Sequence, residues 1–144
     1  MKFFSTQPIY RNEGLALIRI ITGLFMAYHG WEVFDREKML TYMTWDQFRT
    51  PASSLLVYTG KSVELVAGVL LALGLLTRVA ALMLALTMLY ISFFVGGGKI
   101  WYEDQHPFLF VLLALVFLFT GPSRYSLDQL FFTTKDHEHA HPKL

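Results

Sequence analysis

The sequence predicts an all-α integral membrane protein: a four-helix antiparallel bundle with an interfacial segment between the first two helices. Of its 144 residues, 54% are hydrophobic and 16% are charged, whereas soluble domains carry about 25% charged residues. Four apolar stretches approach the about 20 residues that a helix needs to cross a bilayer. The segment after the first stretch mixes charged with large apolar residues, as a helix at a membrane surface does. The chain is therefore expected to form a single transmembrane domain over residues 1–144.

The first span is expected at about residues 15–34. The apolar run before it is short and is broken by Gln7 and Pro8. Because a secretory signal has a longer uninterrupted run, this helix is expected to stay in the mature protein. The residues from about 35 to 54 follow it, and their mixed character places them along the membrane surface.

The second and third spans are expected at about residues 55–76 and 79–95. Thr77 and Arg78 form the turn between them. So short a turn makes the two helices antiparallel neighbours. Three glycines at residues 96–98 are expected to end the third helix.

The fourth span is expected at about residues 101–120. The uncharged run from Pro107 to Thr120 is too short by itself, so the helix is expected to begin near Trp101. A second interfacial piece follows, and a polar tail covers residues 133–144. A solvated tail explains its three histidines better than a metal site does. They are His137, His139 and His141.

Composition excludes several classes of function. The formal net charge of +1 leaves no broad basic face for a nucleic acid. Cysteine is absent, so no iron–sulfur cluster can be ligated by Cys. The Gly-rich nucleotide-binding motifs and the nucleophile motif of serine hydrolases do not occur. The partner that the composition predicts is the lipid bilayer.

Ionisable residues inside the spans are costly in lipid, so they are expected to face the interior of the bundle and to find partners there. Arg19 and His29 fall on one face of the first helix, and Lys61 can pair with Glu64 at i,i+3. His29 and Lys61 are expected in the outer half of the bundle and Arg19 in its inner half. The long side chain of Arg19 can still reach toward Glu64. The candidate binding residues are Arg19, His29, Lys61, Glu64, Glu103 and His106.

Two interpretations of this polar interior stay open. The charges can be structural ion pairs that fix how the helices pack. Alternatively, they can bind a quinone, with a histidine as proton donor, a glutamate as proton acceptor and an aromatic wall for the ring. The candidate walls are Trp31, Tyr90, Trp101 and Tyr102. An interfacial aromatic belt is the better explanation for all of these except Tyr90. Haem is disfavoured, because two histidines without an attachment motif are weak support for it.

The runs LALIRIITGLFMAYHGWEVF and GKSVELVAGVLLALGLLTRVAALMLALTMLY make the chain similar to the DoxX family of small four-helix bacterial membrane proteins. The resemblance covers about residues 14–95, and GPSRYSLD resembles the usual C-terminal flank of the family. The matching positions are Arg19, His29, Gly30, Glu64, Gly68, Gly74, Thr77, Arg78, Ser126, Leu127 and Asp128. The family often has a lysine shortly after the His-Gly pair, where this chain has Glu32 and Val33, so a role of that lysine would fall to Lys61.

The resemblance implies a subunit of a quinone-linked redox system in the bacterial plasma (inner) membrane, with a non-covalently bound quinone. The alternative is a non-catalytic scaffold or assembly subunit, whose partner is another membrane protein or a second copy of the chain. Six Lys and Arg residues flank the spans on the side of the termini and four on the other side. This bias favours cytoplasmic termini.

Overall fold

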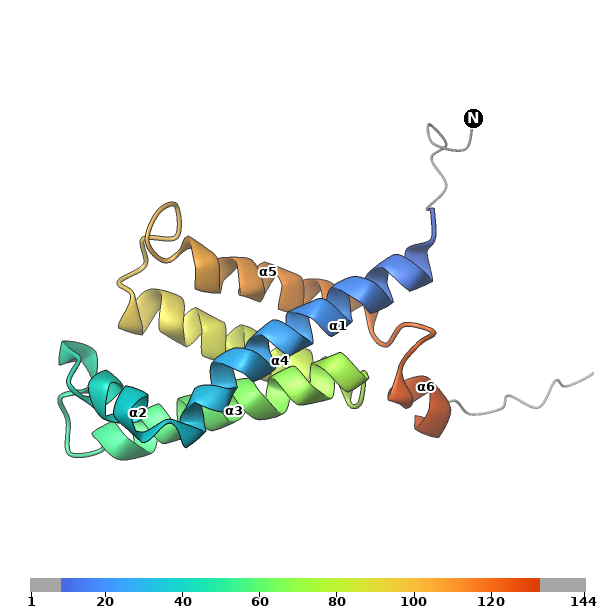
Figure 1. Ribbon diagram of the computed structural model, residues 1–144. Coiled ribbons are helices and arrows are strands. Elements are labelled where there is room, and N and C mark those ends of the chain that lie inside the picture. Colours follow the sequence, from blue (N-terminus) through green and yellow to red (C-terminus); the bar gives the residue numbers. More distant parts are fainter. Residues whose placement is uncertain (1–8, 133–144) are drawn as a thin grey trace, which may run out of the picture.

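The structure, a computed structural model, describes residues 9–132. The predictions for residues 1–8 and for the polar tail 133–144, including its histidines, lie outside the described residues. Within 9–132 the chain is all-helical without strands, which confirms the predicted class (Figure 1). The elements are α1 (Arg11–Gly30), η2 (Trp31–Phe34), α2 (Arg36–Met43), η3 (Asp46–Phe48), α3 (Ser53–Leu73), α4 (Thr77–Tyr90), η4 (Ile91–Val95), α5 (Gln105–Thr120) and α6 (Leu127–Phe132).

The four long helices pack in a chain of neighbours. α3 packs against both α1 and α4, and α4 packs against α5, whereas α1 and α5 make few contacts. The short helices α2 and α6 lie at opposite ends of this arrangement (Figure 1). We refer to these as the α2 end and the α6 end. The apolar core between them is built from α1, α3, α4 and α5, with Leu71, Leu84 and Phe117 among its buried members.

Two stretches are long and apolar enough to cross a membrane. They are Ser53–Leu73, with 21 residues, and Thr77–Val95, with 19 residues, the latter being α4 and η4 together. α5 is also apolar but has 16 residues. Large apolar side chains such as Leu17, Phe25 and Leu86 point outward from the long helices. Such surfaces suit a lipid environment, whereas membrane crossing by α1 and α5 stays a prediction.

α1 and α3 approach each other through glycines. A Cβ added at Gly30 would overlap the backbone nitrogen of Leu65, and one added at Gly68 would overlap that of Ala27. Gly23 lies equally close to the backbone of α3. The small residues at these positions therefore let the two helices pack backbone against backbone.

The turn between α3 and α4 lies earlier in the chain than the sequence suggests. α3 ends at Leu73, and Gly74 follows with a φ of 67°, a left-handed conformation that ends helices readily. Leu76 also has a positive φ, 49°, and α4 begins at Thr77. The prediction that Thr77 and Arg78 form the turn is therefore wrong, because the left-handed residues are Gly74 and Leu76.

The helix expected from Trp101 begins instead at Gln105. The backbone from residue 99 to 104 folds into a turn, in which the Asp104 carboxylate accepts a hydrogen bond from the Lys99 N–H at 2.7 Å. Pro107 then falls in the first helical turn, where a missing N–H costs little. At the end of the third stretch, η4 stops at Val95 before Gly96, as the three glycines predict.

Candidate functional site

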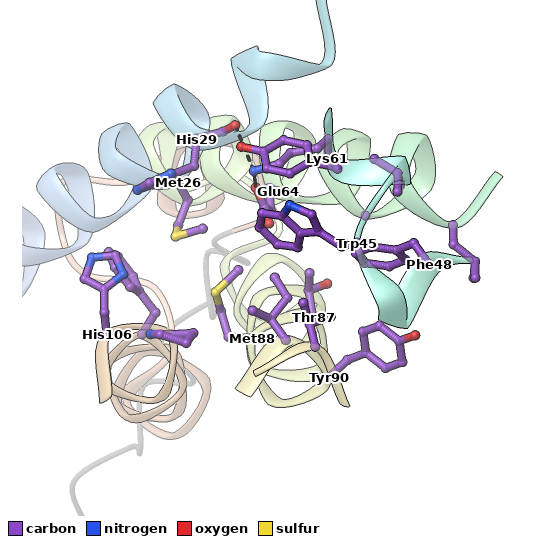
Figure 2. A pocket seen from close by; sticks show the side chains of 18 residues that line it. Met26, His29, Trp45, Phe48, Lys61, Glu64, Thr87, Met88, Tyr90 and His106 are labelled. Atoms are coloured by element: carbon purple, nitrogen blue, oxygen red, sulfur yellow. Dashed lines mark hydrogen bonds and ion pairs between the residues drawn. The ribbon is translucent and has the colours of Figure 1, made fainter. Parts of the chain in front are cut away.

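A pocket of about 250 Å³ lies at the α2 end. Figure 2 shows its lining side chains, which come from α1, α3, α4 with η4, α5 and the segment over residues 36–48. We call that segment the cover, because Tyr42, Trp45 and Phe48 line the pocket from it. The polar residues of the wall are His29, Lys61, Glu64, Thr87 and His106, and its apolar residues include Met26, Val57, Met88, Ile91 and Phe110. The wall is mainly apolar, with its charged groups gathered at one place.

Both helical elements of the cover, α2 and η3, are fixed by specific contacts. The Asp35 side chain caps α2 by accepting hydrogen bonds from the N–H groups of Glu37 and Lys38. Met39 is fully buried and joins Phe48 and Val57 in a small apolar cluster. The cover is therefore a packed part of the fold and not a loose loop.

The end of α4 that faces the pocket is a π-helix, η4, in place of regular α-helix. Ile91 and Val95 of this segment line the pocket, and the Gln47 side-chain amide donates a hydrogen bond to the Val95 carbonyl at 2.8 Å. π-helical segments are rare and often lie at functional sites, because they free backbone carbonyls and redirect side chains. Here one such carbonyl binds the cover.

A bridging lysine organises the charges of the pocket. The Lys61 ammonium lies 3.0 Å from a carboxylate oxygen of Glu64 and 3.0 Å from one of Glu32. The Glu64 side chain is only 5% exposed, and the Lys61 ammonium compensates its charge. This confirms the predicted i,i+3 pair of Lys61 and Glu64 and adds Glu32, which the sequence did not single out.

Tyr42 closes this cluster from the cover. Its hydroxyl donates a hydrogen bond to Glu32 at 2.6 Å, and the Lys61 ammonium lies 5.1 Å from the centre of its ring. Burial and the hydrogen bond to Glu32 raise the pKa of Tyr42 to about 12. The tyrosine therefore stays neutral and keeps donating this hydrogen bond across the physiological pH range.

Two histidines from different helices meet at the pocket. The rings of His29 in α1 and His106 in α5 are 5.9 Å apart between centroids and contact edge to face. His106 also contacts Phe110, with 5.2 Å between centroids. Because α1 and α5 otherwise make few contacts, this pair is a main bridge between them. Four of the candidate binding residues, His29, Lys61, Glu64 and His106, line this one pocket.

Arg19 is placed elsewhere. Its side chain is fully buried at the α6 end, where it donates hydrogen bonds to the carbonyls of Leu71 at 3.0 Å and Tyr125 at 2.6 Å. The expected contact of Arg19 with Glu64 is therefore absent, and Arg19 binds two backbone carbonyls instead. These carbonyls are available because α3 ends and the chain turns nearby.

Asp128 completes the α6 end. Its carboxylate accepts hydrogen bonds from the N–H groups of Leu76 at 2.6 Å and Thr77 at 2.8 Å, at the start of α4. Its own N–H donates to the carbonyl of Gly74 at 2.9 Å. A residue of α6 therefore caps another helix and holds the left-handed Leu76 in place.

Glu103 does not join the pocket. It pairs with Lys99 at 2.9 Å, and both side chains are largely exposed. Trp31, Trp101 and Tyr102 are also exposed and lie outside the pocket lining, whereas Tyr90 lines it. For Trp31, Trp101 and Tyr102, this placement favours the interfacial aromatic belt over a wall of the binding pocket.

The sequence did not predict Glu32 or the cover residues Tyr42, Trp45 and Phe48 as parts of the site. A signal for Glu32 was present, because it follows His29 by three residues and lies close to the position where the family resemblance implies a lysine. For the aromatic residues no comparable signal exists, since their role depends on how the cover folds back over the long helices.

The chemistry of the pocket suits an organic ligand. Among residues 9–132, no group of three or more His, Asp or Glu side chains is placed to hold a metal ion. Aromatic and aliphatic walls beside a carboxylate–ammonium pair and two imidazoles favour a flat molecule that carries hydroxyl or carbonyl oxygens.

Comparisons of the sequence with known proteins identify its relatives. The chain is similar to an uncharacterized protein of Haemophilus influenzae, with 33% identity over 85% of this chain and 94% of that protein. It is also similar to an uncharacterized membrane protein of Mycobacterium tuberculosis (32% identity, 78% of this chain and 77% of that protein) and to a Bacillus subtilis protein named "Putative oxidoreductase CatD" (28%, 85% and 90%). No solved structure matches. The DoxX family model matches residues 14–97, and the chain is therefore a membrane protein that belongs to the DoxX family.

Proposed function

We propose that this protein is a membrane subunit of a quinone-linked redox system and that its pocket binds the ring of a quinone or hydroquinone. The observation that carries the proposal is the composition of the pocket at the α2 end. There a buried ion pair, Lys61 and Glu64, faces a cavity whose other walls are largely aromatic and aliphatic. Apolar walls bind the ring, and the few polar groups orient it.

The size of the pocket favours a single ring. Pockets for drug-sized ligands measure about 300–1,000 Å³, and this one measures about 250 Å³. Trp45 and Phe48 stack with 6.5 Å between ring centroids and offer an aromatic surface on the cover side. A ring placed against them has the ion pair within the same enclosure (Figure 2).

The polar groups match both redox forms of such a ring. The carbonyl oxygens of a quinone accept hydrogen bonds from Lys61 or from an imidazole N–H, and the hydroxyl groups of a hydroquinone donate to Glu64. The name of the Bacillus subtilis relative, which contains the word oxidoreductase, supports a redox role. The electron donor would be a partner protein or a second cofactor in the membrane.

The same proposal includes a topology. We infer that α1, α3, α4 with η4, and α5 each cross the bacterial inner membrane, so that both termini lie in the cytoplasm. α1 has 20 residues and exposes large apolar side chains along its length. α5 is shorter, and the turn before it at residues 99–104 would lie at the headgroup level.

Binding of duroquinone, a single-ring benzoquinone, to the purified protein in detergent tests the proposal. Trp45 lines the pocket, so bound quinone is expected to quench tryptophan fluorescence. The variant Glu64→Gln removes the charge that compensates Lys61 and is expected to weaken binding about tenfold. The matched control is Glu103→Gln, which changes an exposed glutamate that also pairs with a lysine and is expected to bind as the wild type does.

Two outcomes would contradict the proposal. Equal losses of folded yield and of binding in Glu64→Gln would make the ion pair structural. Absence of quinone binding by the wild type, together with a protein that co-purifies in stable complex after gentle solubilisation, would instead support the scaffold function.

A further inference from the structure

The pocket has a charged connection to the outside. A surface hollow at the same end of the molecule is lined by Glu32, Lys38 and neighbouring residues of η2 and α2. Glu32 lines this hollow and not the pocket, whereas Lys61 and Glu64 line the pocket and not the hollow. The 3.0 Å contact between Lys61 and Glu32 therefore joins the two spaces.

Exposure rises in steps along this connection. The side chains of Glu64, Lys61, Glu32 and Lys38 are 5%, 15%, 17% and 51% exposed, respectively. Each neighbouring pair forms an ion pair, since the Lys38 ammonium lies 2.9 Å from Glu32 and the Lys61 ammonium lies 3.0 Å from both glutamates.

We propose that Lys61 and Glu32 form the route by which protons pass between the pocket and the aqueous surface at the α2 end. This inference rests on the proposed function, because it requires a pocket ligand that gains or loses a hydroxyl proton. Glu32 is then a positioning and proton-transfer residue that lies outside the binding cavity itself.

The transfer balances without any further reactant. A ligand hydroxyl gives its proton to the Glu64 carboxylate, and the Lys61 ammonium gives one of its own protons to the Glu32 carboxylate. The neutral Lys61 amine then takes the proton from Glu64, which restores the ion pair, and Glu32 releases its proton to water. The ligand is left as an oxyanion beside the Lys61 ammonium, and the reverse sequence reprotonates it.

The groups that face Lys61 suit this role. From α3 it meets Glu64, from η2 Glu32, and from α2 the ring of Tyr42. From α1 it meets the carbonyl of His29 at 3.5 Å, and the His29 imidazole lines the same pocket. Tyr42 donates its proton in a hydrogen bond to Glu32, so it orients that carboxylate and does not compete for the proton of Lys61.

A pH jump with 4-nitrophenol as the probe tests the route, because the phenol and phenolate forms of this probe absorb differently. The probe is bound to the purified protein and mixed rapidly with buffer of higher pH, and the absorbance of the bound fraction is followed. In the wild type, the bound probe is expected to lose its proton faster than it dissociates. In Glu32→Gln the same phase is expected to slow at least tenfold, to the rate of probe dissociation, while the Kd stays within about twofold.

Controls separate this route from a structural role. Glu103→Gln is expected to leave the rate unchanged, and Glu32→Asp, which keeps the charge but shortens the side chain, is expected to give an intermediate rate. An unchanged rate in Glu32→Gln, or in Glu32→Asp should the first variant not fold, overturns the route while leaving the binding pocket standing. A rate that changes only in step with the Kd also overturns it. Absence of probe binding by the wild type, with absence of duroquinone binding, overturns the proposed function and the route together.

Discussion

The two ends of the molecule use buried charges in opposite ways. At the α6 end, Arg19 and Asp128 bind backbone carbonyls and N–H groups, and each therefore completes the hydrogen bonding of a helix end. At the α2 end, Lys61, Glu64 and Glu32 bind one another and stand beside a cavity. Charges that bind the backbone at helix ends hold the fold, whereas charges that mainly bind other side chains beside a cavity can exchange a partner for a ligand.

The largest effect that this contrast predicts is on stability at the α6 end. Arg19→Met removes the buried charge and both of its hydrogen bonds, to the carbonyls of Leu71 and Tyr125, so the free energy of unfolding is expected to fall by about 3 kcal/mol. The measurement is titration of the detergent-solubilised protein with sodium dodecyl sulfate, followed by tryptophan fluorescence. In the folded fraction, the affinity for duroquinone is expected to stay within twofold of the wild type. Weaker quinone binding at unchanged stability would place Arg19 in the binding site and break the contrast.

A smaller loss of stability is expected from Asp128→Asn. An amide has one acceptor oxygen, so it cannot replace the carboxylate toward both Leu76 and Thr77, and the negative charge at the start of α4 is lost. The expected decrease in unfolding free energy is about 1.5 kcal/mol. The same denaturation experiment measures it, with Asp46→Asn as a control, since Asp46 forms an exposed pair with Arg49. Equal effects of the two variants would contradict a capping role.

The smallest effect concerns the cover at the α2 end. Trp45 is 42% exposed, and its ring forms one wall of the pocket. Trp45→Ala removes this wall. The expected result is an about fivefold weaker binding of a quinone, measured by equilibrium dialysis because the variant loses its fluorescent reporter. The unfolding free energy is expected to change by less than about 1 kcal/mol. Trp101→Ala is the control, as Trp101 is exposed and lies outside the pocket.

Sequence reasoning succeeded where an interaction is local. The Lys61–Glu64 pair follows from i,i+3 spacing on one helix. The end of η4 before the three glycines is local as well. In both cases residues within one short segment determine the outcome.

It failed where an interaction depends on how segments fold back. Arg19 has carbonyl partners 52 and 106 residues away in the chain, and no periodicity reveals that these lie nearer than Glu64. The start of α5 depends on the contact of Asp104 with the Lys99 backbone, which competes with helix formation over residues 101–104. The cover contributes Tyr42, Trp45 and Phe48 to the pocket, yet its sequence predicts only a helix at the membrane surface.

The hydrogen bond between Arg19 and Tyr125 also has a consequence for biogenesis. The arginine is made early, in the first long helix, and its acceptor is made 106 residues later. If α1 crosses the membrane as proposed, the guanidinium nitrogen that binds Tyr125 has to be kept hydrated or held by the insertion machinery until residue 125 leaves the ribosome, because acyl chains offer it no acceptor. Final assembly of the helices is therefore tied to completion of translation. A nascent chain that stops short of Asp128 also lacks the carboxylate that binds the N–H groups of Leu76 and Thr77 in the turn between α3 and α4.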